Sequence, residues 1–248
     1  MPAAADVHRM FDSIAGRYDA LNRILSLGTD RAWRRRTCDE LGVSAGQTAV
    51  DLCCGTGDLA LAMVQRGARV IGSDFSHEML VLAAAKGVSE LAEADCLRLP
   101  FADGSFDLVT VAFGARNLEN LEAGLGEMLR VLKPGGRLGL LEFASPPGML
   151  FRRVYLAYLT WIVPLVGAVV SGRGSAYSYL STSIQSFADQ EEMTAILRGI
   201  GFESVRHIDF ARGIAALYIG YRASGDTEHR GNARQDRGPR VNRPSAAP

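Results

Sequence analysis

Residues 50 to 60 read VDLCCGTGDLA and join an apolar, strand-like run to a glycine-rich turn. Gly55, Thr56 and Gly57 follow the run, and the segment after them has the composition of a helix. Glycine lets a backbone turn tightly and approach a ligand closely, and a helix N-terminus offers free N–H groups. Three interpretations compete: a nucleotide-binding turn, a cysteine pair for metal or redox chemistry, and a buried strand with an ordinary loop.

The cysteines do not have the spacing of a metal site. The chain contains Cys38, Cys53, Cys54 and Cys96, with no C-x-x-C and no Cys/His cluster. Cys53 and Cys54 are adjacent in a strand-like run, so we expect their side chains to point to opposite faces. We interpret all four as small buried residues in a reducing compartment, and we expect no metal.

Acidic residues accompany the glycine turn at the ends of the expected strands. Asp74 ends the second strand, in VIGSDFS, near the spacing of a carboxylate that accepts hydrogen bonds from ribose hydroxyls. The turn and Asp74 fit a dinucleotide or the adenosyl group of S-adenosylmethionine. Asp51 before the glycines and Asp95 at the third strand end favour S-adenosylmethionine, and Asp58 would repel a pyrophosphate. Asp74 as a helix cap and Asp95 as a turn residue are the alternatives.

Strand-like and helix-like segments alternate through the middle of the chain, which predicts an α/β fold with a doubly wound parallel sheet. Crossovers are expected to be right-handed, and two late strands form an antiparallel hairpin. The expected strands are 48–54, 68–74, 90–96, 106–113, 137–143, 202–210 and 214–222, and the expected helices are 7–28, 30–42, 55–67, 77–87, 120–132 and 190–201, with KPGG at 133–136 as a loop.

Changes of composition divide the chain into five parts. We expect an N-terminal helical cap at 1–44, a nucleotide-binding core at 45–143, an apolar lid insertion at 144–188, and a helix and hairpin completing the sheet at 189–223. Residues 224–248 are polar and arginine-rich, so we interpret them as a disordered tail.

Bulk charge and hydropathy exclude some classes of protein. Twenty-seven basic and 27 acidic residues give a net charge of zero, which does not favour nucleic acid as a partner. The first ten residues lack the apolar segment of a secretory signal. The uncharged run 154–170 contains Pro164 and Gly167 and is shorter than the roughly 20 residues of a spanning helix. It is expected to be buried, to touch a membrane surface, or to form a subunit interface.

Several motifs together resemble one family of enzymes. GTGD, the strand end at Asp74, D-C-x-x-LPF, FDLV-x-V-x-FG-x-RN and LKPGGRL-x-x-LEF are similar to class I S-adenosylmethionine-dependent methyltransferases. More narrowly, FG-x-RN, the segment AYSYL and the final hairpin resemble the ubiquinone/menaquinone biosynthesis C-methyltransferase family, over residues 8 to 221. The resemblance implies a seven-stranded Rossmann-like sheet with a helical lid, and S-adenosylmethionine as cofactor.

The resemblance also assigns roles to individual residues. Two positions depart from the family pattern, because Ala112 stands where serine is frequent and Cys96 where alanine is frequent. The loss of a hydroxyl at Ala112 removes one contact to the cofactor, whereas at Cys96 the backbone N–H can still bind adenine. The candidate cofactor-binding residues are Asp51, Gly55, Thr56, Gly57, Asp74, Phe75, Asp95, Cys96 and Ala112.

The candidate catalytic residues are Arg116, Asn117 and Tyr179. Arg116 would stabilise a developing phenolate, Asn117 would orient it, and Tyr179 would contact the substrate from the lid with Tyr177. The alternatives are a surface salt bridge of Arg116 with Glu119 or Glu142 and ordinary packing of the tyrosines.

The implied reaction is C-methylation of a polyprenylated hydroquinone, with demethylmenaquinol favoured over a methoxy-benzoquinol. The rival interpretations are a sterol or phenol methyltransferase, a nicotinamide dehydrogenase, a nucleic-acid methyltransferase and a noncatalytic cofactor-binding partner. We expect a cytoplasmic enzyme with a lipophilic quinol substrate, peripheral contact with the inner membrane face, no nucleic-acid partner, and potentially a homodimer.

Overall fold

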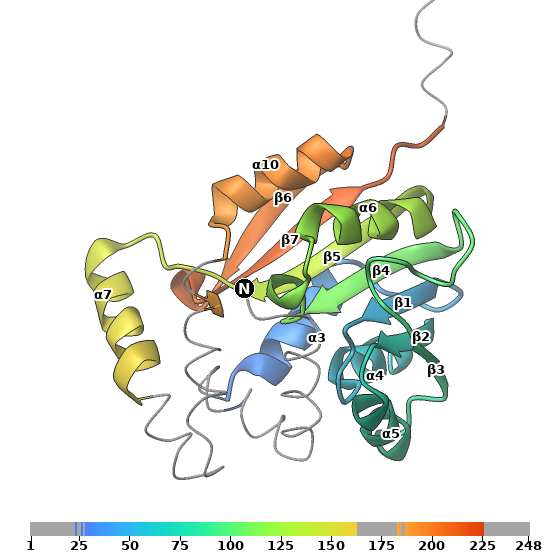
Figure 1. Ribbon diagram of the computed structural model, residues 1–248, viewed down its shortest axis with the longest axis horizontal. Coiled ribbons are helices and arrows are strands. Elements are labelled where there is room, and N and C mark those ends of the chain that lie inside the picture. The colour runs from blue at the N-terminus through green and yellow to red at the C-terminus, as the bar shows by residue number, and fades with distance from the viewer. Residues whose placement is uncertain (1–22, 24–25, 27, 163–182, 185–186, 226–248) are drawn as a thin grey trace, which may run out of the picture.

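The fold is a seven-stranded mixed sheet with helices on both faces, as Figure 1 shows. It is seen in a computed structural model that describes residues 23, 26, 28–162, 183–184 and 187–225. The strand order is β3-β2-β1-β4-β5-β7-β6, and strands β1 to β5 run parallel. The strands are β1 (Thr48–Leu52), β2 (Arg69–Asp74), β3 (Glu90–Glu93), β4 (Phe106–Ala112), β5 (Leu132–Phe143), β6 (Glu203–Phe210) and β7 (Ala215–Tyr221).

Two apolar clusters cover the two faces of the sheet. Strand β4 supplies both, because Leu108 faces one cluster and its neighbour Val109 faces the other. Helices α3 (Asp30–Glu40), α4 (Asp58–Val64) and α5 (His77–Lys86) lie on one side of the sheet, and α6 (Leu121–Val131) and α10 (Gln190–Ile200) lie on the other (Figure 1). The expected doubly wound fold is therefore confirmed.

Local chemistry sets the helix ends. Ser76 caps α5 by accepting from Met79 N, Asn120 caps α6 and Asp189 caps α10 in the same way. Gly87 and Gly201 end α5 and α10 in the left-handed conformation that glycine adopts without a Cβ penalty. These caps lie within a residue or two of the ends expected from the sequence.

Several expected boundaries were wrong, among them the end of β3, which lies at Glu93 and not at residue 96. Strand β1 ends at Leu52, two residues before the predicted end, because Cys53 has a φ of 48° and turns the chain. Helix α4 ends at Val64, three residues before Gly67. KPGG is not a separate loop, because β5 begins at Leu132 opposite Phe106 and regains regular pairing at Arg137 after an irregularity.

The two strands of the C-terminal hairpin occupy different positions in the sheet. Strands β6 and β7 are joined by the 3-10 turn η4 (Ala211–Gly213) and pair antiparallel, as expected. Strand β7 also pairs antiparallel with β5, so it lies between β5 and β6 and is buried from Ala215 to Gly220. The last strand in sequence is thus an interior strand, and β6 forms the edge.

The expected lid insertion is described only in part. Helix α7 (Met149–Ala157) continues into the π-helical turn η3 (Tyr158–Ile162), and Figure 1 shows α7 at one end of the molecule, apart from the other helices. Tyr155 and Leu159 anchor this segment in an apolar cluster. The N-terminal helix predicted at 7–28 and the tail from 226 onward lie largely or wholly outside the described residues.

Candidate functional site

The glycine turn after β1 has a backbone that favours glycine. Gly57 has a φ of 82°, and a Cβ there would lie 2.6 Å from a methyl of Val88. Gly55 has a φ of 55°, and its N–H donates to the Asp74 carboxylate at 2.8 Å. The turn is therefore fixed both by close packing of Gly57 against Val88 and by a hydrogen bond to the end of β2.

Asp74 connects two turns at the carboxyl edge of the sheet. One carboxylate oxygen accepts from Gly55 N at 2.8 Å and the other from Ser76 N at 3.0 Å, and the side chain is 5% exposed. The helix cap expected as its alternative role belongs to Ser76. These two bonds hold the carboxylate at the end of β2, beside the glycine turn.

Lys86 is a site residue that the sequence analysis missed. Its Nζ donates to Thr56 Oγ1 at 2.7 Å and to Asp58 Oδ1 at 2.8 Å. The charge of Asp58 at the start of α4 is therefore paired, which weakens the argument that Asp58 alone would repel a pyrophosphate. Lys86 lies 30 positions from Thr56, so only the packing of α5 beside the turn reveals the contact.

Asp51 is buried inside β1, next to the turn. Thr110 Oγ1 donates to its Oδ1 at 2.7 Å, and Oδ2 has no hydrogen-bond partner in the structure. Burial raises the pKa of Asp51 to about 7, against lowering effects from the Thr110 hydrogen bond and the Arg34 charge. A buried polar atom without a partner is unusual, and it makes Asp51 Oδ2 available to a ligand or an ordered water.

Replacing Asp51 with asparagine is expected to flatten the pH dependence of folding stability. The folded pKa of about 7 lies above the unfolded value, so the native state holds this proton longer than the unfolded state. Stability should therefore fall as pH rises from about 4 to about 7. Melting temperatures between pH 5 and 8 should drop less for Asp51→Asn than for the natural protein, and parallel curves would contradict the assignment.

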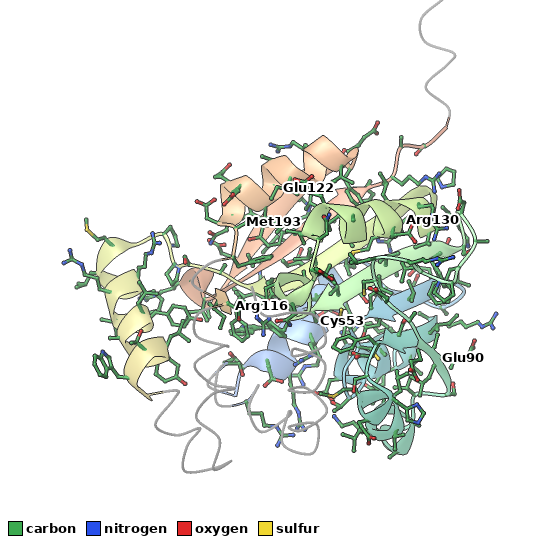
Figure 2. The ribbon with its side chains drawn as sticks, viewed as in Figure 1. Cys53, Glu90, Arg116, Glu122, Arg130 and Met193 are labelled. Carbon is green, nitrogen blue, oxygen red and sulfur yellow. The ribbon has the colours of Figure 1, made fainter. Side chains whose placement is uncertain are left out.

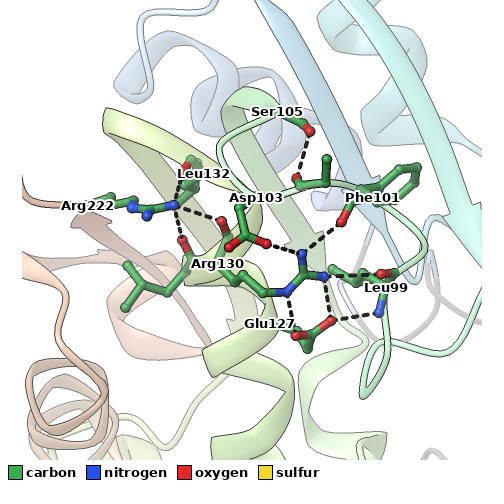
Figure 3. A network of polar contacts seen from close by, with 10 residues as sticks. Leu99, Phe101, Asp103, Ser105, Glu127, Arg130, Leu132 and Arg222 are labelled. Atoms are coloured by element: carbon green, nitrogen blue, oxygen red, sulfur yellow. Dashed lines mark hydrogen bonds and ion pairs between the residues drawn. The ribbon is translucent and has the colours of Figure 1, made fainter.

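The loop that carries Asp95 and Cys96 is clamped to α6 by Arg130. Its guanidinium donates to the carbonyl oxygens of Leu99 and Phe101 and pairs with Glu127 and Asp103, as Figure 3 shows. Glu127 also accepts from Leu99 N at 2.8 Å, and the hydrogen bonds from Arg130 hold its pKa below the usual value. These contacts fix the later part of the loop and do not involve Asp95 or Cys96.

Asp95 and Cys96 themselves remain close to the glycine turn. Asp95 is exposed and accepts from Leu97 N at 2.9 Å, so it does shape a turn, as its alternative role required. Cys96 is 6% exposed, and its Sγ lies 3.5 Å from the Sγ of Cys53. This contact joins the loop after β3 to the turn after β1.

Arg116 forms a buried ion pair, not a surface one. It lies in the 3-10 turn η2 (Ala115–Asn117) after β4, and its Nη1 lies 2.6 Å from Glu142 Oε1, with side chains 2% and 0% exposed. Nη1 also donates to Phe113 O at 2.6 Å, whereas Nε has no hydrogen-bond partner among the residues that the structure describes. Glu142 further accepts from the backbone N–H groups of Arg116 and Phe143. Figure 2 shows Arg116 at the carboxyl end of the parallel strands.

Aromatic rings and a buried tyrosine hydroxyl lie near this ion pair. Phe113 and Phe143 stack with ring centroids 4.5 Å apart, and the guanidinium of Arg116 lies 5.6 Å from the Phe143 centroid. Tyr155 of α7 belongs to the same apolar cluster, and within the described ranges its hydroxyl has no hydrogen-bond partner. Burial raises the pKa of Tyr155, whereas the Arg116 charge lowers it, so the phenol stays protonated beside the pair.

The remaining predicted residues are placed as follows. Ala112 is the last residue of β4 and pairs with Leu141, and Phe75 follows Asp74 in the turn before α5. Asn117 ends η2, next to Arg116. Tyr177 and Tyr179 lie outside the described residues. The structure thus gathers the cofactor candidates and Arg116 along one sheet edge, and it adds Lys86, Glu142 and Tyr155.

Two classes of feature are absent from the residues that the structure covers. No group of three or more His, Cys, Asp or Glu side chains gathers there in a way that could hold a metal ion. Within the same ranges, every helix is too short or too polar to cross a bilayer.

The strand order and the glycine turn define the Rossmann-like class to which S-adenosylmethionine-dependent methyltransferases belong. A solved methyltransferase of this type from Aquifex aeolicus aligns with a TM-score of 0.57 at 17% identity, over 77% of this chain and 89% of that one. A sequence model of the ubiE/COQ5 methyltransferase family matches residues 2–222. The chain belongs to the ubiE/COQ5 methyltransferase family.

Two curated relatives show how far the similarity extends. The demethylmenaquinone methyltransferase of Thermus thermophilus is 46% identical over 220 residues, which is 86% of this chain and all of that protein. The ubiquinone/menaquinone biosynthesis C-methyltransferase UbiE of Geotalea uraniireducens is 43% identical over 86% of this chain and 95% of its own length.

Proposed function

We propose that this protein transfers a methyl group from S-adenosylmethionine to a ring carbon of demethylmenaquinol. The observation that carries the proposal is the 46% identity to a demethylmenaquinone methyltransferase over that protein's full length. The site is compatible with the cofactor. It has a glycine turn with no room for a Cβ at Gly57, a buried carboxylate at Asp74, and a buried Asp51 oxygen without a partner.

Each part of the site has a distinct task in binding the cofactor. Asp74 is placed to accept hydrogen bonds from ribose hydroxyls, Asp51 Oδ2 to receive the ammonium directly or through water, and the Asp95–Cys96 loop to hold adenine. Lys86 keeps Thr56 and Asp58 in position beside the turn. S-adenosylmethionine, when bound, supplies an electrophilic methyl group. No dinucleotide is needed, so S-adenosylhomocysteine and not NAD should raise the melting temperature.

Arg116 and Tyr155 are assigned to the quinol headgroup. A quinol carbon becomes nucleophilic as its phenolic oxygen loses a proton, so donors that face this oxygen lower the barrier. Arg116 Nε and Tyr155 Oη are both buried donors that have no partner in the part of the chain that the structure describes. Glu142 already neutralises the charge of Arg116, so Arg116 acts here as an oriented donor more than as a free cation. Orientation by a fixed ion pair holds the ring carbon in line with the methyl group.

Replacing Tyr155 with phenylalanine should lower kcat by about tenfold to a hundredfold, because one hydrogen bond to the developing oxyanion is lost. The ring stays in its apolar cluster, so stability should not fall, and removal of an unpartnered buried hydroxyl can raise it. The matched control is Tyr158→Phe, which alters the next tyrosine on this segment. Equal kcat for Tyr155→Phe and the natural protein would contradict the role.

The activity is tested with purified protein, S-adenosylmethionine and demethylmenaquinone that has been reduced chemically to the quinol. We expect one methyl group on a ring carbon of the product, located by mass-spectrometric fragmentation, and no product from the oxidised quinone. A methoxy-benzoquinol substrate in parallel distinguishes a naphthoquinol enzyme from one that serves both quinones. Methylation of oxygen in place of carbon, or of a sterol alone, would refute the proposal.

The same proposal places α7 and η3 at the cytoplasmic membrane surface, where a polyprenylated substrate resides. Leu150, Val154 and Trp161 recur at helical spacing and are 79%, 61% and 74% exposed. The opposite stripe, Tyr155 and Leu159, is buried against the protein. Exposed Arg152 and Arg153 lie on the same helix and would attract anionic lipid headgroups. An apolar stripe beside basic residues is typical of an interfacial helix.

Vesicles that contain anionic lipid should sediment the natural protein but not the double variant Leu150→Asp/Val154→Asp. The matched control is Val64→Asp/Val81→Asp, which places the same charges at exposed valines on α4 and α5. The control should sediment like the natural protein. Equal sedimentation of both double variants, or none by the natural protein, would exclude α7 as the membrane contact.

A further inference from the structure

Cys53 and Cys96 are two thiols in contact beside the glycine turn. Their sulfur atoms are 3.5 Å apart although the residues are 43 positions apart in sequence. Cys53 lies in the turn after β1 and Cys96 in the loop after β3, so the contact joins two segments assigned to the cofactor. In the described part of the chain, Cys38 and Cys54 make no comparable contact with another sulfur.

The two sulfur atoms must approach each other before they can bond. A disulfide needs the sulfur atoms about 2.05 Å apart, so about 1.5 Å of approach separates the two states. Cys53 is half-buried, whereas Cys96 is 6% exposed. The hydrogen bond to Cys96 and burial raise the pKa of Cys53. Oxidation should therefore be slow at neutral pH and faster as pH rises.

We propose that Cys53 and Cys96 close a reversible disulfide when a peroxide oxidises them, and that this disulfide and the bound cofactor exclude each other. In the first step the Cys53 thiol loses its proton, and the thiolate attacks the peroxide to form a sulfenic acid and hydroxide, which takes up that proton and becomes water. In the second step Cys96 attacks the sulfenic sulfur, which forms the S–S bond and releases a second water. Two thiols and one hydrogen peroxide thus give one disulfide and two waters.

Exclusion follows from what the two cysteines adjoin, and this half of the inference rests on the proposed function. Cys53 precedes the turn whose Gly55 N–H is bound to Asp74, and it packs against Gly114 so closely that a Cβ there would lie 2.4 Å from the Cys53 Cβ. Cys96 follows Asp95 directly. Drawing the sulfur atoms together displaces one or both segments. If the disulfide weakens cofactor binding, then bound cofactor must oppose disulfide formation by the same factor.

Disulfide formation is tested first, without cofactor. Full-length reduced protein is treated with hydrogen peroxide, blocked with N-ethylmaleimide and digested with trypsin, which releases fragments 37–66 and 87–98. We expect these two fragments to be joined, with the bond located at Cys53 by fragmentation and reversed by dithiothreitol. Cys53→Ser and Cys96→Ser should abolish the cross-link, whereas Cys38→Ala and Cys54→Ser should keep it. Absence of the joined fragments, or a bond through Cys54, would overturn the inference.

Cofactor binding is then measured by calorimetry with S-adenosylhomocysteine. The affinity should fall at least about tenfold on oxidation and return with dithiothreitol, and saturating S-adenosylhomocysteine should slow cross-linking. The Cys53→Ser variant cannot form this disulfide, so its affinity for S-adenosylhomocysteine should be the same before and after oxidation. If cross-linked protein binds as tightly as reduced protein, the exclusion is wrong. If reduced protein shows no binding, the proposed function fails while the cross-linking result still stands.

Discussion

Replacing Glu142 with alanine is expected to lower the free energy of unfolding by about 3–5 kcal/mol, because Arg116 would remain buried without a partner for its charge. Three donors on this carboxylate also lose their acceptor, namely Arg116 Nη1 and the backbone N–H groups of Arg116 and Phe143. Urea unfolding measures the loss. Glu40→Ala, which breaks solvent-accessible pairs with Arg36 and Arg206, should cost less than about 1 kcal/mol.

Two further variants separate folding from catalysis at this pair. Glu142→Gln keeps the volume and one oxygen acceptor, so it should fold, yet its kcat should fall about a hundredfold as Arg116 loses its fixed orientation. Arg116→Ala/Glu142→Ala removes both charges, and it should recover part of the stability of Glu142→Ala but none of the activity. Equal free energies of unfolding for Glu142→Ala and Glu40→Ala would show that the buried ion pair contributes no more to stability than an exposed one.

Replacing Gly114 with alanine is expected to be the second most damaging change. Its φ of −114° suits any residue, but a Cβ there would lie 2.4 Å from the Cys53 Cβ and 3.0 Å from its Sγ. The turn after β1 or the turn after β4 must shift. We expect a loss of about 1–3 kcal/mol in stability and weaker binding of S-adenosylhomocysteine, measured by unfolding and calorimetry.

The control for Gly114 is Gly126→Ala in α6, where nothing lies within 4 Å of the added Cβ. It should leave binding unchanged and stabilise the helix by up to about 1 kcal/mol. Because Cys53 has a φ of 48°, Cys53→Gly is compatible with the backbone and removes the atoms that the new methyl group meets. The double variant Gly114→Ala/Cys53→Gly should therefore regain stability. Failure of this rescue would show that the damage of Gly114→Ala has another cause.

The sequence predicted the central sheet well because each strand carries its own pattern. Runs such as residues 106–112 are rich in β-branched and apolar residues and are bounded by turns. Asp74 could be predicted because the glycine turn and the second strand end stand at a recognisable spacing. The resemblance of FG-x-RN to a known family drew attention to Arg116.

The partners of these residues could not be read from the sequence. Glu142 stands within an apolar strand of the pattern LGLLEF, and only the pairing of β4 with β5 brings it to Arg116. Tyr155 is one tyrosine in an apolar run, and its missing hydrogen bond is visible only in three dimensions. Cys53 and Cys96 meet only because the loop after β3 folds back to the end of β1. All three features depend on how segments that are far apart in the sequence pack together in the fold.

The interior position of β7 also has a consequence for biosynthesis. While the ribosome is still adding residues 203–210, β5 has only β4 as a neighbour and its other edge is unpaired. Strand β6 cannot join the sheet before β7 exists, since β7 alone bridges it to β5. Nascent chains thus carry an open, apolar edge until nearly the last strand has been synthesised, and they should depend on chaperones at that stage.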